Sequence, residues 1–83
     1  MQKYRTSALF VAAFLTVVIG KPETQLVGNI RPLVEFWWPD PDGRVQQAAL
    51  DYIKHAKVDA RRYAEAIREC RSLIEETKVA GAR

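Results

Sequence analysis

The sequence predicts an all-α chain without an independent globular core. We expect a single-pass N-terminal transmembrane helix over residues 1–21, a short helical bend at the membrane interface over 22–40, a long amphipathic helix on the solvent side over 41–80, and a tail at 81–83. Three observations lead to this prediction: an uncharged apolar run near the N-terminus, an aromatic segment broken by proline and glycine, and a long stretch of good helix formers.

Length and composition narrow the class of protein. A chain of 83 residues allows one small domain at most. It is 48% hydrophobic and 28% charged, which excludes collagen-like and low-complexity chains, and its lone cysteine, Cys70, cannot form a disulfide within the chain. A net charge of +3 does not by itself imply a nucleic-acid partner. These limits argue against a self-contained enzyme.

The predicted membrane anchor is the run over residues 7–20, which has apolar side chains on every helical face. Residues 4–19 would form about 24 Å of helix, short of the ~30 Å hydrocarbon core. Lys3, Arg5 and Lys21 can extend this reach by snorkelling, and their distribution predicts an N-terminus on the matrix or cytoplasmic side. The anchor side chains are Leu9, Phe10, Val11, Phe14, Leu15, Val17, Val18 and Ile19.

Two other interpretations of this run stay open. A positively charged start followed by a short apolar core is also typical of a secretory signal, although no clear Ala-x-Ala site follows it. Alternatively, residues 7–20 are a buried helix of a soluble assembly, because a helix that is apolar all round must be covered by something.

The connector over residues 22–40 mixes helix breakers with large apolar side chains. Trp37 and Trp38, together with Tyr4, are candidates for the membrane interface, where indole and phenol rings favour the headgroup zone. An equal alternative is that the two tryptophans wedge against a partner subunit. Helical spacing of its apolar positions predicts two short turns that share one side: Leu26, Ile30, Leu33 and Trp37.

The long helix is expected to begin at Asp40, with Pro41 at its first position. Its apolar residues recur every ~3.6 positions, which predicts one straight stripe along the helix. Because a single striped helix has nothing in its own chain to pack against, we expect the stripe to bind other subunits. The stripe contains Val45, Ala49, Tyr52, Ala56, Ala60, Tyr63, Ile67, Cys70 and Ile74.

No residue pattern for catalysis or cofactor binding is present. The four glycines are too scattered to cradle a phosphate. His55 and Asp51 could form a two-ligand pair, but no further His or Cys lies on that face. Cys70 lies on the stripe and is expected to be a small buried hydrophobe. Acidic residues interleave with the basic ones of the long helix, so we expect no nucleic-acid partner. Without a recognisable motif, we also expect no metal, cofactor or small-molecule substrate.

The functional hypothesis is a non-catalytic accessory subunit that ties the membrane part of a large complex to a soluble part. In architecture the chain resembles single-span subunits of mitochondrial respiratory complexes and ATP synthases, without a residue-by-residue match. The predicted partners are therefore the lipid bilayer of the mitochondrial inner membrane and neighbouring subunits. The alternative is a bacterial or phage protein, anchored in the inner membrane, whose periplasmic helix bridges or regulates envelope components.

Overall fold

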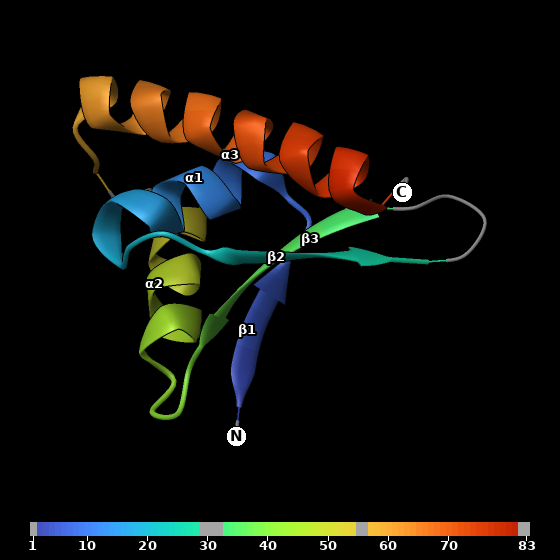
Figure 1. Cartoon of the computed structure of the whole chain (residues 1–83). Helices are drawn as coiled ribbons and strands as arrows, with labels where there is room; N and C mark the ends of the chain where they lie inside the picture. The colour runs from blue at the N-terminus through green and yellow to red at the C-terminus, as the bar shows by residue number, and fades with distance from the viewer. Residues whose placement is uncertain (1, 29–32, 55–56, 82–83) are drawn as a thin grey trace.

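The computed structural model describes residues 2–28, 33–54 and 57–81, and over them the chain is an α+β domain. It contains a three-stranded antiparallel sheet and three helices (Figure 1). The all-α prediction is therefore wrong. The elements follow one another as β1 (Lys3–Thr6), α1 (Leu9–Val18), β2 (Glu23–Val27), β3 (Leu33–Pro39), α2 (Arg44–Ile53) and α3 (Ala60–Gly81).

Strand β3 is the middle strand, and β1 and β2 pair with it on either side, both antiparallel. Val34, Phe36 and Trp38 are at most 4% exposed and alternate with more exposed neighbours, as expected for a strand with one buried face. The helical turns expected over 22–40 are thus replaced by two strands. Nearly every residue over 33–38 is apolar, so periodicity could not separate the two structures, whereas the aromatic and β-branched composition favours a strand.

Helix α1 is the centre of the hydrophobic core. Four consecutive residues from Ala12 to Leu15 are at most 3% exposed, so every face of the helix is covered at its midpoint. The buried side chains that share this core come from β3, α2 and α3: Phe36, Trp38, Val45, Ala49, Ala66 and Cys70. The apolar run is therefore covered by the chain itself, and the prediction of no independent core is wrong.

The predicted transmembrane span is corrected by the same observation. Helix α1 has 10 residues, about 15 Å at the usual rise, which is half a bilayer core. Among the described residues, no helix combines the length and the apolar character that a membrane crossing requires. The predicted membrane location, with its mitochondrial or bacterial inner-membrane alternatives, is accordingly not supported.

The long helix expected over 41–80 is two helices. Helix α2 ends at Ile53 and α3 begins at Ala60, after Asp59, whose Oδ1 accepts the backbone N–H of Arg62 at 3.0 Å. Asp59 is therefore the N-terminal cap of α3, and it stabilises the start of a second helix after the break. The break lets both helices turn their apolar sides toward α1, which one straight helix could not do.

The start of α2 agrees in part with its prediction. The Asp40 carboxylate, 4% exposed, accepts the backbone N–H groups of Val45 at 2.9 Å and Gln46 at 3.0 Å. It therefore caps the helix as expected, although the helix begins at Arg44 rather than at Pro41. Gly43 makes the intervening turn with a φ of 77°, a conformation that glycine adopts without strain.

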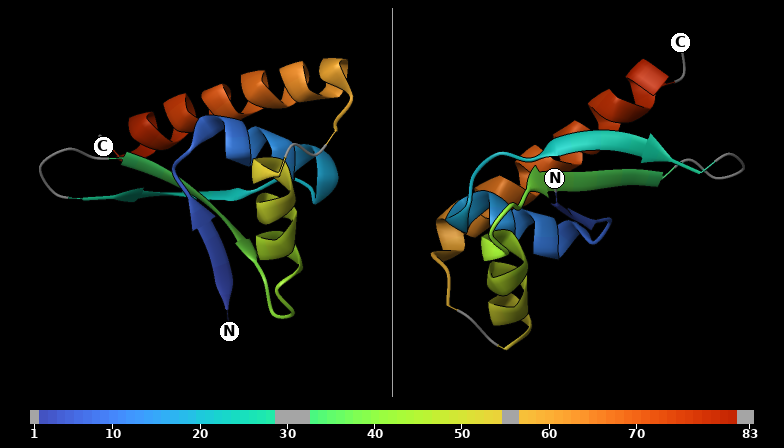
Figure 2. Two further views of the ribbon diagram at one scale, coloured as in Figure 1. Left: turned by 180° about the vertical axis from the view of Figure 1, so that it is seen from behind. Right: turned by 90° about the horizontal axis from the view of Figure 1, so that it is seen from below.

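Helix α3 crosses α1 and reaches the β2–β3 end of the sheet with its C-terminal turns (Figure 2). The Thr24 and Thr77 hydroxyls lie 2.7 Å apart and join β2 to α3. The helices thus lie above or to the left of the sheet in Figure 1, and no helix of the described residues covers the opposite sheet face.

Candidate functional site

The candidate site is the helix-free face of the sheet, which we call the outer sheet face. Side chains alternate between the two faces of a strand, so the residues between the buried positions of β3 and their cross-strand neighbours point away from the core. Trp37 is the large aromatic side chain on this face and is partly exposed. Leu33 on this face is 51% exposed. The outer sheet face comprises Lys3, Arg5, Glu23, Gln25, Val27, Leu33, Glu35, Trp37 and Pro39.

One row of this face combines three kinds of side chain. Arg5 on β1 and Glu23 on β2 both lie directly opposite Trp37 on β3, so a cation, an indole and an anion stand in line across the sheet. The Lys3 ammonium lies over the Trp37 ring, 4.1 Å from its centroid. This cation–π contact holds the indole on the sheet while leaving part of it accessible.

The charges on the outer sheet face are divided between its two sides. Lys3 and Arg5 make the β1 side basic. Glu23 makes the β2 side acidic, and Glu35 adds an anion on the middle strand, where its Oε1 accepts the Gln25 side-chain N–H at 2.9 Å. The face as a whole is balanced in charge but strongly polarised from one edge strand to the other.

Some of the predicted anchor residues are buried in the core, and others are exposed. Phe14 and Leu15 are buried in the core, and Leu9, Val11 and Val17 are partly buried against it. The exposed members are Phe10, Val18 and Ile19, at 52%, 47% and 37%. The run therefore serves as a core helix with one exposed fringe.

The three aromatic residues predicted to lie at the membrane interface are on different faces of the sheet. Tyr4 lies opposite Trp38 on the inner face of the sheet and packs against the core. Trp38 is 3% exposed, and its Nε1–H donates to the Gly20 carbonyl at 2.9 Å. Only Trp37 of these three lies on the outer sheet face.

The predicted binding stripe packs within the chain. Its buried or partly buried members in the core are Val45, Ala49, Tyr52, Tyr63, Ile67, Cys70 and Ile74. Ala60 is exposed, and Ala56 lies outside the described residues, as does His55. The structure places these side chains in a core shared with α1 of the same chain.

Tyr63 joins α3 to both other helices. Its hydroxyl lies 3.3 Å from that of Tyr52 and donates to the Phe10 carbonyl at 3.3 Å. Burial, followed by the hydrogen bond and charge interaction with Tyr52, raises the pKa of Tyr63 to about 12. Such a phenol stays protonated at neutral pH and acts as a structural hydrogen-bonding group.

Cys70 has the properties of a core residue. It is fully buried, and its Sγ lies 3.6 Å from the Thr16 hydroxyl. Burial raises the pKa of the Cys70 thiol above its ordinary value, which disfavours the reactive thiolate. This environment suits a packed side chain rather than a nucleophile.

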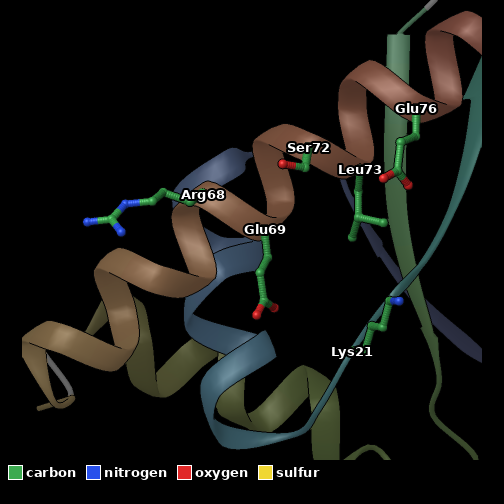
Figure 3. Close-up of a pocket in the computed structure, with 6 residues that line it drawn as sticks. All are labelled: Lys21, Arg68, Glu69, Ser72, Leu73 and Glu76. Atoms are coloured by element: carbon green, nitrogen blue, oxygen red, sulfur yellow. The ribbon is translucent and has the colours of Figure 1, made fainter.

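A hollow beside α3 does not assemble a catalytic set (Figure 3). Glu69 and Glu76 extend from the helix toward the side of Lys21, while Arg68 points away from them. The two carboxylates are seven residues apart, about 10 Å along the helix, too far to act on one atom. Among the described residues, no three His, Cys, Asp or Glu side chains gather as metal ligands would.

Sequence reasoning missed the outer sheet face, because Arg5, Glu23 and Trp37 are far apart in the chain and become neighbours only through strand pairing. The alternation of buried and exposed residues over 33–39 was the available signal. Comparisons with models of protein families, with curated proteins and with solved structures find no match to this chain. The function must therefore be argued from this surface.

Proposed function

We propose that this chain is a non-catalytic accessory subunit that acts by contact, holding a partner polypeptide on its outer sheet face. The observation that carries the proposal is the row formed by Arg5, Trp37 and Glu23 on a sheet face without a helix. The membrane tether expected from the sequence is not part of this role, because no described helix is suited to cross a bilayer.

The chemistry of the row supports protein contact. Tryptophan and arginine are the side chains that most often dominate the binding energy of protein interfaces, where they lie near the centre and are ringed by polar groups. Trp37 has this central place, since charged residues flank it on both neighbouring strands. Charges of both signs around it would orient a partner and exclude poorly matched ones.

The polar groups in and beside the core support a contact role over a catalytic one. Asp40 caps α2, and the Tyr63 hydroxyl joins the three helices, so each has a structural partner. Cys70 is enclosed in the core.

The test is quantitative affinity purification of the tagged chain at native expression, with partners identified and counted by mass spectrometry. Trp37→Ala should reduce the bound partner at least tenfold, the loss typical of a central aromatic residue. Leu50→Ala is the matched control, because Leu50 is 42% exposed on α2 and lies off the outer sheet face; it should retain the partner.

Circular dichroism must first show that both variants are folded to the wild-type extent. Glu23→Ala provides a second change on the same row with less effect on packing. A chain that co-purifies with no stoichiometric protein and also does not self-associate in solution would contradict the proposal. A partner that is retained by both Trp37→Ala and Glu23→Ala would contradict it as well.

A further inference from the structure

We propose that the occupant of the outer sheet face is a second copy of this chain, bound face to face with a two-fold axis parallel to β3. The inference rests on the proposed function and names its partner. It follows from the cross-strand register and from the separation of charge on this face.

The symmetry can be worked out from the strand order. A two-fold axis that lies between two stacked sheets and runs along the strands exchanges their left and right sides. It therefore places β1 of one copy over β2 of the other, on both sides of the middle strands. Such an interface is isologous, so each contact occurs twice.

The register then brings opposite charges together without any shift along the strands. Arg5 and Glu23 lie at the same height in the sheet, because both are opposite Trp37. In the dimer Arg5 of each copy faces Glu23 of the other, and the two Trp37 side chains meet on the axis. One chain thus carries both halves of a complementary surface.

The other face-to-face arrangement is electrostatically unfavourable. An axis perpendicular to the strands would stack β1 on β1, so Arg5 would face Arg5 and Glu23 would face Glu23. Like charges that face each other across an interface oppose association. The axis along β3 forms two Arg5–Glu23 attractions and places Glu35 over Glu35 of the second copy as one repulsion on the axis. The axis across the strands at the height of Trp37 forms no such attraction, so the charge distribution favours the axis along β3.

The size of the face sets the strength of the dimer. The seven residues of β3 at about 3.4 Å each span about 24 Å, and three strands spaced about 4.8 Å apart are about 14 Å wide. Because β1 pairs only with residues 36–39 and β2 only with 33–37, this rectangle is an upper limit for the face. This is smaller than the ~800 Å² per partner of standard stable complexes. We therefore expect a weak dimer, with a dissociation constant in the micromolar range or above, that dissociates further as salt screens the charges.

The test is analytical ultracentrifugation of the full chain from about 5 μM to 1 mM, at low and high salt. Arg5→Glu and Glu23→Arg each turn two attractive pairs into two repulsive ones. Each variant alone should dimerise roughly 10- to 30-fold more weakly than wild type. An equimolar mixture of the two restores both attractive pairs, one with the native signs and one with exchanged signs, so a heterodimer should form within about threefold of the wild-type affinity.

Arg71→Glu is the matched control, because it changes net charge equally at an exposed position on α3. It should change dimerisation less than about twofold. The neutral changes Arg5→Gln and Glu23→Gln, expected to weaken the dimer roughly threefold each, repeat the test should a reversed charge disturb the fold.

Each contrary outcome overturns a defined part of the proposal. If Arg5→Glu dimerises when mixed with wild type but not when mixed with Glu23→Arg, the two-fold axis runs across the strands. A wild-type chain that stays monomeric at 1 mM and low salt would exclude the second copy as partner. The proposed function would survive that result if Trp37→Ala still released a different protein in affinity purification.

Discussion

Adjacent residues of this chain have opposite roles, because a strand turns successive side chains to opposite faces. Trp38 is 3% exposed, and its indole N–H is bonded to the Gly20 carbonyl, whereas Trp37 lies under the Lys3 ammonium on the outer sheet face. The same residue type is thus a core component at one position and the centre of the candidate site at the next.

Tyr63 provides a prediction at the residue scale. Its pKa is raised to about 12 in the folded chain from the ordinary value of 10, so the unfolded chain loses this proton first as pH rises. The stability from this group should be complete below pH 10 and should fall between about pH 10 and pH 12. Urea unfolding followed by circular dichroism at pH 7, 9 and 11.5 measures the decline.

Tyr63→Phe is the informative variant for this effect. It should cost roughly 0.5–1.5 kcal/mol at pH 7, because the hydrogen-bonding partner of Tyr52 is lost, and should show a smaller decline above pH 10. In a pH titration followed by phenolate absorbance, the variant should lack the ionisation step with the highest pKa. An unchanged alkaline decline in the variant would assign the effect to another group.

At the scale of elements, the apolar helix α1 organises the molecule. Helices α2 and α3 pack on it, and the inner face of the sheet contributes Phe36 and Trp38 to the same core. The Thr16 hydroxyl is accommodated because it donates to the Ala12 carbonyl at 2.8 Å, so this polar group of the helix is not left unpaired. An all-round apolar helix is therefore explained by neighbours on several sides.

The matching prediction compares two positions of α1. Leu15→Ala should destabilise the chain by roughly 2–5 kcal/mol, because Leu15 is fully buried and its truncation leaves a cavity. Phe10→Ala should cost clearly less, since Phe10 is 52% exposed. Urea unfolding curves give both values, and similar costs at the two positions would contradict the described packing of α1.

At the scale of the whole molecule, the sheet and the helices share one core and should unfold together. In a Trp37→Phe variant, the remaining tryptophan is the buried Trp38, whose fluorescence reports on the core. Its unfolding midpoint in urea should coincide with that of far-UV circular dichroism, to which α3 contributes strongly. A separate earlier transition in circular dichroism would show that α3 is only loosely attached.

The sequence by itself determined which segments avoid water. Most of the apolar run over residues 7–20 had to be covered, Asp40 had to cap a helix, and the stripe from Val45 to Ile74 had to pack against another element. Each of these requirements is local, because it depends on side-chain type and on spacing along a single element.

Only the tertiary structure decided which neighbours bury these apolar segments. Burial of apolar surface is nearly non-directional, so residues 7–20 meet the same requirement in lipid, in another subunit or within their own chain. The break between Ile53 and Ala60 and the pairing of β1 and β2 with β3 bring that cover from the same chain. The outer sheet face follows from the same pairing, because strand register joins residues that no local pattern along the sequence connects.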